Sequence, residues 1–181
     1  GHVPGFAAHP HFGFETVSIV TKGMVDHSDS LGGKGRLGNG DVQWRTSGKG
    51  VEHGEMFPLL NKDKNPCESF QLWLNRGAKN KKVNPYYQML WSEDIPKIKV
   101  EDEKGKRTEI DLIAGHLNGE KALSPNPDSW AADPSNNVQI WTIKLSPNAR
   151  FTISAVNEEL TRTLYFYEGK SLTIADTEIQ A

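Results

Sequence analysis

Along most of the chain, apolar and polar residues alternate in short runs, the pattern of a β-strand with one buried face. In the clearest run, SFQLWLN at residues 69–75, the large apolar residues at even positions share one face, whereas Gln71 and Trp73 share the other. No stretch keeps a 3.6-residue period over the ~12 residues of an average helix, so the pattern predicts an all-β chain. The runs that we expect to be strands are Phe14–Val20, Val25–His27, Val42–Arg45, Gly50–Met56, Ser69–Asn75, Ile110–His116, Val138–Leu145, Arg150–Ile153, Leu164–Tyr167 and Ser171–Ala175.

Glycine and proline separate these runs: the chain has 17 Gly and 10 Pro. Loops are expected at residues 31–40, 57–67 and 120–137. We expect Val25–His27 to pair with the preceding strand as a hairpin, because Lys22-Gly23 between them is a turn signal. Many short strands joined by tight turns are typical of a β-sandwich or a jelly-roll barrel.

Charge and cysteine content narrow the classes of function. The 21 basic and 23 acidic residues give a net charge of −2, so we expect no direct binding to nucleic acid. The single cysteine, Cys67, cannot form an internal disulfide, which fits a reducing compartment and predicts a cytoplasmic protein. No apolar run approaches the ~18 residues of a membrane span, so no membrane association is expected.

Both ends of the sequence suggest a piece of a longer protein. The first six residues lead straight toward a strand, and the last residues follow an alternating run without a closing element. We therefore expect a chain truncated at both ends. Strand edges exposed by truncation can pair with another chain, which predicts homo-oligomerisation.

Four residues have the spacing of a metal site. His9 and His11 are two residues apart before the first strong strand, and His53 and Glu55 are two apart in a later one. Residues two apart share a face of a strand, so each pair points one way. If both strands face one interior, three imidazoles and a carboxylate converge as ligands for a divalent metal. The other histidines are expected to be solvated or packed; they are His2, His27 and His116.

The segments that contain these pairs resemble the two metal motifs of the pirin family of cupins. They are GFAAHPHFGFETV at Gly5–Val17 and GDVQWRTSGKGVEHGEM at Gly40–Met56. FQLWLN at Phe70–Asn75 and NPYYQ at Asn84–Gln88 are also similar to pirin sequences. The resemblance is close from residue 5 to 93 and loose beyond it.

The resemblance implies a bicupin, with two cupin double-stranded β-helix (jelly-roll) domains and metal only in the first. On this basis residues 1–119 are a complete N-terminal metal-binding cupin, and 120–137 are a connecting loop. Residues 138–181 are the beginning of an incomplete C-terminal cupin without a metal site.

The same resemblance assigns roles to residues at the site. It implies His9, His11, His53 and Glu55 as metal ligands, the same four that the spacing selects. It implies a structural Glu15, which we expect to orient a histidine or close the strand. Four further side chains flank the metal segments and are either core or pocket wall. They are Phe14, Trp44, Met56 and Phe12, the last standing where pirins usually have arginine.

In function, the resemblance implies an Fe(II)-dependent dioxygenase of the quercetin 2,3-dioxygenase type. Its substrates would be O₂ and a small aromatic, flavonol-like molecule, with Glu55 as general base. Three nitrogens and one oxygen also suit Mn, Ni, Cu or Zn. The alternative is a non-enzymatic, iron-binding, redox-sensitive regulatory protein that acts through protein partners. A third interpretation is a fragment that binds metal but is inactive.

Overall fold

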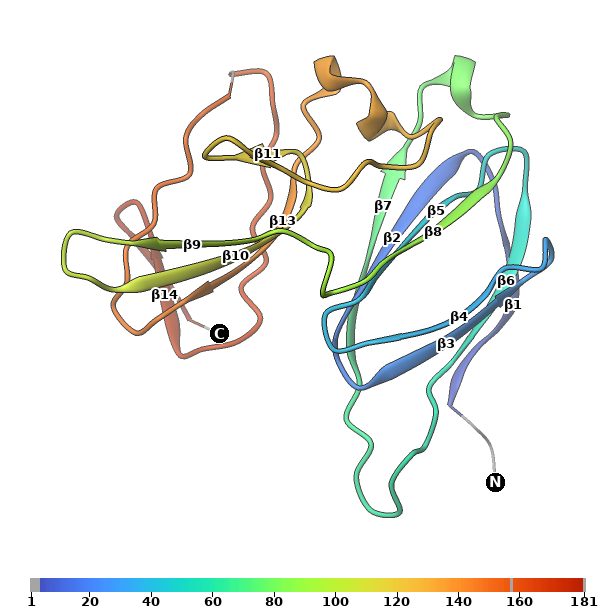
Figure 1. Cartoon of the computed structure of the whole chain (residues 1–181), viewed down its shortest axis with the longest axis horizontal. Helices are drawn as coiled ribbons and strands as arrows, with labels where there is room; N and C mark the ends of the chain where they lie inside the picture. Colours follow the sequence, from blue (N-terminus) through green and yellow to red (C-terminus); the bar gives the residue numbers. More distant parts are fainter. Residues whose placement is uncertain (1–3, 157, 181) are drawn as a thin grey trace. The chain divides into compact units, whose positions relative to one another are not determined.

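Eight strands in the first half of the chain form two four-stranded antiparallel sheets that face each other (Figure 1). The structure is a computed structural model, which describes residues 4–156 and 158–180. The two sheets have the orders β1-β6-β3-β4 and β7-β2-β5-β8. The strands are β1 Gly5–His11, β2 Phe14–Lys22, β3 Met24–Asp29, β4 Lys34–Gly38, β5 Val42–Thr46, β6 Val51–Met56, β7 Glu68–Asn75 and β8 Tyr86–Leu90. The all-β cupin fold that the sequence predicted is confirmed.

The expected hairpin between β2 and β3 is wrong. β2 pairs with β5 and β7, whereas β3 pairs with β4 and β6 in the opposite sheet. The reason is burial: residues 15–20 are all buried, so β2 needs a strand on each side and cover on both faces. β3 supplies part of that cover, because Val25 packs with Val20 across the two sheets. At Lys22-Gly23 the chain therefore passes from one sheet to the other.

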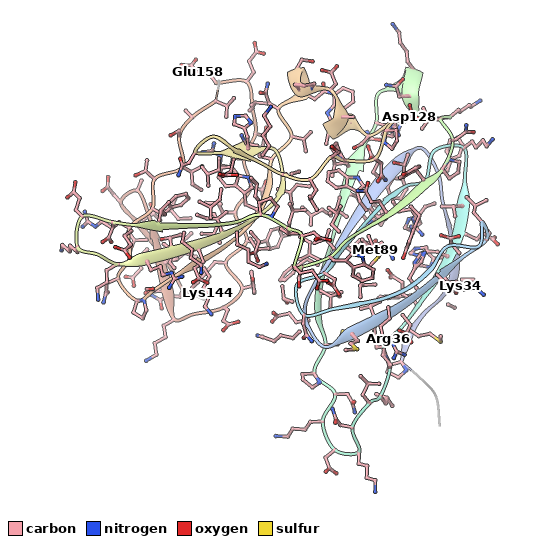
Figure 2. All side chains as sticks on the ribbon, viewed as in Figure 1. Lys34, Arg36, Met89, Asp128, Lys144 and Glu158 are labelled. Carbon is pink, nitrogen blue, oxygen red and sulfur yellow. The ribbon has the colours of Figure 1, made fainter. Side chains whose placement is uncertain are left out.

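Residues 31–40, expected to be a loop, contain the edge strand β4. Leu37 anchors this strand, since it is 1% exposed and packs with Val20 and Val25. Gly38 fits where it does because a side chain there would collide with the Gly23 carbonyl oxygen. On the outer side of the sheet, Arg36 donates to both carboxylate oxygens of Asp26 at 2.6 and 2.8 Å (Figure 2 labels Arg36).

A third sheet follows, with the order β13-β10-β9. Its strands are β9 Lys97–Glu101, β10 Arg107–Ala114 and β13 Ile140–Leu145; beside them β11 His116–Leu117 pairs with β12 Glu120–Lys121. Within the described residues the helices are three-residue 3₁₀ turns, η1 Ala78–Asn80, η2 Trp130–Ala132 and η3 Pro134–Asn136. None of them has the length to cross a membrane. The largest apolar cluster joins this sheet to β2 and β5; its buried members are Val17, Ile19, Val42, Trp44, Leu90, Ile95, Ile113, Ala114 and Ile140.

The chain divides into two compact units, residues 1–151 and 152–181. β13, expected to open a second domain, pairs with β10 inside the first unit. The segment expected as a connecting loop, 120–137, contains β12 and two of the 3₁₀ turns. The assignment of residues 138–181 to a second cupin stays a prediction.

The second unit contains one hairpin, β14 Ser171–Ile174 with β15 Thr177–Gln180. The strands expected at 150–153 and 164–167 are wrong: the described residues between 146 and 170 form no strand. A strand requires a second backbone to pair with, and alternation alone does not supply one. Here the apolar residues stay on the surface, since Tyr165 is 80% exposed.

Candidate metal centre

Pairing of β1 with β6 brings three histidines together. In this ladder His9 lies directly opposite His53, and His11 lies two residues further along β1. The ring centroids of His53 are 4.4 Å from His9 and 4.7 Å from His11. One ring nitrogen from each histidine lies within 4.8 Å of the other two. The structure thus brings the three imidazoles together, and their role as metal ligands stays a prediction.

Glu55 continues the same face of β6 and is 8% exposed. Its carboxylate, with ring nitrogens of His53 and His27, forms a second group of ligand atoms within 4.8 Å. Burial raises the pKa of Glu55, although Arg45 and His9 act in the opposite direction. His53 belongs to both groups and is the centre of the cluster.

The electrostatics leave the imidazoles of His11 and His53 neutral. Burial, with the nearby Arg45 charge, lowers the pKa of His11 to about 4 and that of His53 to about 2. At neutral pH each of these two rings therefore has a lone pair on one nitrogen, which in His11 is Nδ1, the acceptor of a hydrogen bond from Arg45. Within the described part of the chain, Nε2 of His53 is buried and has no hydrogen-bond partner. A bare nitrogen beside two imidazoles and a carboxylate fits a divalent transition-metal ion, whose ligands these groups are.

His27, which we expected to be solvated or packed, is packed against the cluster. It is 4% exposed, its Nδ1 lies 3.3 Å from Nδ1 of His53, and its Nε2 lies 3.1 Å from Oδ2 of Asp29. Sequence reasoning missed this connection, although the spacing of His27 and Asp29 on one strand face was a signal. His116 is exposed in β11, away from the cluster, and His2 lies outside the described residues.

Arg45, on β5, is a second residue that sequence reasoning missed. It is 1% exposed, and its Nη2 donates a 2.8 Å hydrogen bond to Nδ1 of His11, while Nε and Nη1 have no partner among the described residues. Burial lowers the pKa of Arg45 to about 10, so the guanidinium is still charged at neutral pH; Glu55 and Asp29 act to raise it. The sequence predicted a strand at Val42–Arg45 but gave no signal that all five residues of β5, the arginine included, would be buried.

Glu15 and Trp44 face away from the histidines. The Glu15 carboxylate accepts hydrogen bonds from Trp44 Nε1 at 2.8 Å, Thr46 Oγ1 at 3.3 Å and the Trp130 amide at 2.7 Å. It orients no histidine, which corrects one of its two expected roles; it joins β2 to β5 and to η2 instead. Trp44 is 1% exposed and belongs to the apolar core, so it is not a pocket wall.

Of the other flanking side chains, only Phe14 lines the pocket. Its ring lies 4.9 Å from that of His11 and 4.8 Å from that of Trp73. Phe12 is 53% exposed in the turn after β1. Met56 is 51% exposed, because it alternates with His53 and Glu55 and so occupies the outer face of β6.

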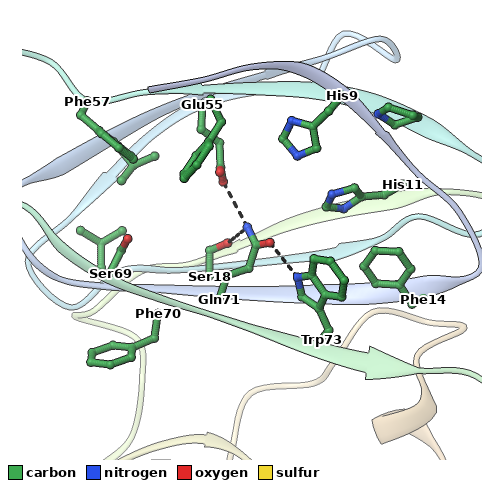
Figure 3. Close-up of a pocket in the computed structure, with 14 residues that line it drawn as sticks. His9, His11, Phe14, Ser18, Glu55, Phe57, Ser69, Phe70, Gln71 and Trp73 are labelled. Atoms are coloured by element: carbon green, nitrogen blue, oxygen red, sulfur yellow. Dashed lines mark hydrogen bonds between the residues drawn. The ribbon is translucent and has the colours of Figure 1, made fainter. Parts of the chain in front are cut away.

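A pocket of about 580 Å³ opens over the histidines (Figure 3). Its polar floor includes Gln71, whose Nε2 donates to Ser18 Oγ at 3.2 Å and to Glu55 Oε1 at 3.4 Å. Trp73 Nε1 donates to Gln71 Oε1 at 2.9 Å. Apart from the histidines, the aromatic side chains that line the pocket are Phe6, Phe14, Phe57, Phe70 and Trp73. The arrangement places a buried carboxylate, that of Glu55, and the imidazoles of His9 and His11 in the lining of an aromatic cavity.

Comparison with known proteins finds that the family model described as pirin matches residues 2–74. A Pseudomonas aeruginosa protein named "Putative quercetin 2,3-dioxygenase" is 43% identical over 112 residues, 61% of this chain and 38% of that protein. A second protein of the same name and organism is 32% identical over 173 residues, 96% of this chain and 56% of the relative. The chain thus spans between about two fifths and just over half of these relatives.

A solved structure shows the same architecture. Quercetin 2,3-dioxygenase from Acinetobacter baumannii is 39% identical and aligns with a TM-score of 0.61, over 69% of this chain and 43% of that chain.

Proposed function

The chain belongs to the pirin family, and from that membership we propose that it is a metal-dependent dioxygenase of the quercetin 2,3-dioxygenase type. One observation carries the proposal: His9, His11 and the buried Glu55 line a cavity with aromatic walls, and His53 lies within ligand distance of both histidines. Relatives that carry the quercetin dioxygenase name support it.

The residues that would hold the ion are His9, His11 and His53, whose ligand atoms lie together, and Glu55, which is grouped with them through His53. We favour Fe(II) because a metal that can change its oxidation state can pass electrons to O₂, whereas Zn²⁺ cannot. When bound, the ion would supply open coordination positions and Lewis acidity toward oxygen ligands.

The cavity suits a planar aromatic substrate such as a flavonol. Its volume of about 580 Å³ lies inside the range of about 300–1,000 Å³ that is usual for small-molecule pockets. Trp73 is 66% exposed, so its indole ring remains available to a ligand. Contact between aromatic rings contributes about 0.5–1.5 kcal/mol beyond area burial, and Phe14 lies beside Trp73 to extend that surface.

Glu55 is suited to accept a proton from a substrate hydroxyl group. Burial raises its pKa, which makes the carboxylate a stronger base than one in water. Gln71 restricts its orientation. Because the Trp73 indole N–H can only donate, Oε1 of Gln71 faces it, and Nε2 is directed to Ser18 and Glu55.

The test is oxygen consumption by the chain loaded anaerobically with Fe(II) and then mixed with quercetin. We expect one O₂ consumed per flavonol, and a loss of about 10²-fold or more in kcat for Glu55→Gln. The matched control is Glu52→Gln, whose side chain is exposed on the outer face of the same strand. Metal-loaded protein that consumes no O₂ with Fe, Mn, Ni or Cu would contradict the proposal and favour the regulatory alternative.

A further inference from the structure

Asp29, His27 and His53 form a buried row that ends at the candidate metal centre. Oδ2 of Asp29 lies 3.1 Å from Nε2 of His27, and Nδ1 of His27 lies 3.3 Å from Nδ1 of His53. The side chains of His27 and Asp29 are 0% and 3% exposed, and His53 is 1% exposed. Tyr87 stacks on the His27 ring, with centroids 5.3 Å apart and planes 21° apart. Water is therefore excluded from the row, and its rings are held by packing.

The direction of the hydrogen bonds begins with Asp29. Its Oδ1 accepts the backbone amides of Leu31 at 2.9 Å and Gly33 at 2.8 Å. Burial works against the charged form, but the bonds from His27, Gly33 and Leu31 outweigh it and lower the pKa of Asp29. The carboxylate is therefore an acceptor at both oxygens, and His27 must present an N–H at Nε2.

That proton determines the rest of the row. The side chain of His27 is 0% exposed, and exclusion from water favours the neutral form of the ring, which has a single N–H. With its proton on Nε2, Nδ1 of His27 carries a lone pair, and Nδ1 of His53 must donate to it. A neutral His53 with its proton on Nδ1 has its lone pair on Nε2, the buried atom without a partner among the described residues.

We propose that Asp29 and His27 are positioning residues that fix the tautomer of His53 and direct a bare Nε2 toward the metal. The inference rests on the proposed metal-dependent function, because its consequence is metal affinity. A metal-bound histidine commonly donates its other N–H to an acceptor that sets the ring's tautomer. Here that acceptor is a second imidazole, supported in turn by a carboxylate.

The first experiment reads the tautomer without any metal. In ¹⁵N-histidine-labelled, metal-free protein, long-range ¹H–¹⁵N correlation should show His53 protonated on Nδ1. In Asp29→Asn the Leu31 and Gly33 amides retain the side-chain oxygen, so the new NH₂ group faces His27. The row then reverses and His53 becomes protonated on Nε2. Calorimetry with Zn²⁺ should show an affinity about 10–100-fold weaker. The matched control, Asp26→Asn, removes a carboxylate from the outer face of the same strand and should change neither result.

A pair of variants at His27 separates positioning from folding. His27→Asn keeps an amide oxygen near the Nδ1 position, so its Zn²⁺ affinity should stay within about threefold of the wild type. His27→Leu has no acceptor there, so its Zn²⁺ affinity should fall about 10–100-fold, as in Asp29→Asn. Wild-type His53 protonated on Nε2, equal affinities for Asp29→Asn and Asp26→Asn, or direct coupling of His27 nitrogens to a bound metal would overturn the inference. A wild-type chain that binds no metal would instead refute the proposed function, while the tautomer of His53 would still test the row.

Discussion

Nη2 of Arg45 lies 2.8 Å from Nδ1 of His11, with both side chains buried. A guanidinium can only donate, so Nδ1 of His11 accepts, and the neutral ring carries its proton on Nε2. A cation at Nε2 of His11 requires that proton to move to Nδ1, which breaks the hydrogen bond from Arg45, and it also lies close to a full positive charge. Arg45 therefore opposes cation binding at a centre that the other residues favour.

Replacing this charge should strengthen metal binding. Arg45→Met removes a buried cation while keeping an unbranched side chain of similar length. Two like charges a few ångströms apart interact by about 1–4 kcal/mol, so the Zn²⁺ affinity should rise roughly tenfold or more. Competition calorimetry measures the Zn²⁺ affinity of both proteins. Arg36→Met, at an exposed ion pair on β4, is the control and should leave the affinity unchanged. Weaker binding by Arg45→Met would show that the guanidinium supports the site.

Trp73 should affect substrate binding more than metal binding. Trp73→Ala removes an exposed indole from the pocket wall, and we expect KM for a flavonol to rise about 5–10-fold. Zn²⁺ affinity should change less than KM does, because the indole is not a ligand and reaches Glu55 only through Gln71. Trp91→Ala, at another partly exposed tryptophan outside the pocket lining, should leave KM unaltered. Steady-state kinetics of both variants decides whether the aromatic wall contacts substrate.

The metal-free protein should lose stability in acid. The pKa values of His11 and His53 are lowered on folding from 6.5 to about 4 and about 2. Their contribution is complete above pH 6.5 and is lost as pH falls toward those values, because the unfolded chain binds the extra protons. Glu55 acts in the opposite direction, since its pKa is raised. Each imidazole loses at most about 1.4 kcal/mol per pH unit below pH 6.5, so urea unfolding should show a loss of up to about 5 kcal/mol between pH 7 and 4.5, reduced by the opposing effect of Glu55. His53→Gln should reduce that slope; a flat profile in the wild type would be incompatible with buried neutral imidazoles.

Glu15 should matter for stability and not for metal binding. Glu15→Gln disturbs a fully buried acceptor of three hydrogen bonds, which should lower the free energy of unfolding by about 1–3 kcal/mol. Metal stoichiometry should remain that of the wild type. Glu52→Gln on the exposed face of β6 should cost less than about 0.5 kcal/mol. Loss of metal from Glu15→Gln at full stability would restore Glu15 to the role of orienting a histidine.

The sequence was most informative where alternation alone decides geometry. Two-residue spacing was enough to predict that His9 and His11 share a face, as do His53 and Glu55. It could not show which strands pair, because pairing depends on burial of both faces, as in β2. The same limit hid Arg45 and His27: each lies on a strand other than β1 and β6, and only the packing of strands brings them to the histidines.

The strands missed or overpredicted have similar causes. β4 is rich in glycine, a composition that predicts a loop, but it is held by one buried leucine, Leu37, and by pairing with β3. Residues 164–167 alternate but have no paired strand among the described residues. Local pattern therefore predicted the fold class, while tertiary partners determined which segments became strands.

The central claim is that His9, His11, His53 and Glu55 hold one divalent cation, and bound metal per chain tests it most directly. Elemental analysis of protein reconstituted anaerobically with Fe(II) and freed of excess metal should give about one iron per chain for the wild type. His53→Ala should give none while keeping the wild-type β-sheet circular dichroism. Equal iron in the wild type and the folded His53→Ala variant would contradict the account.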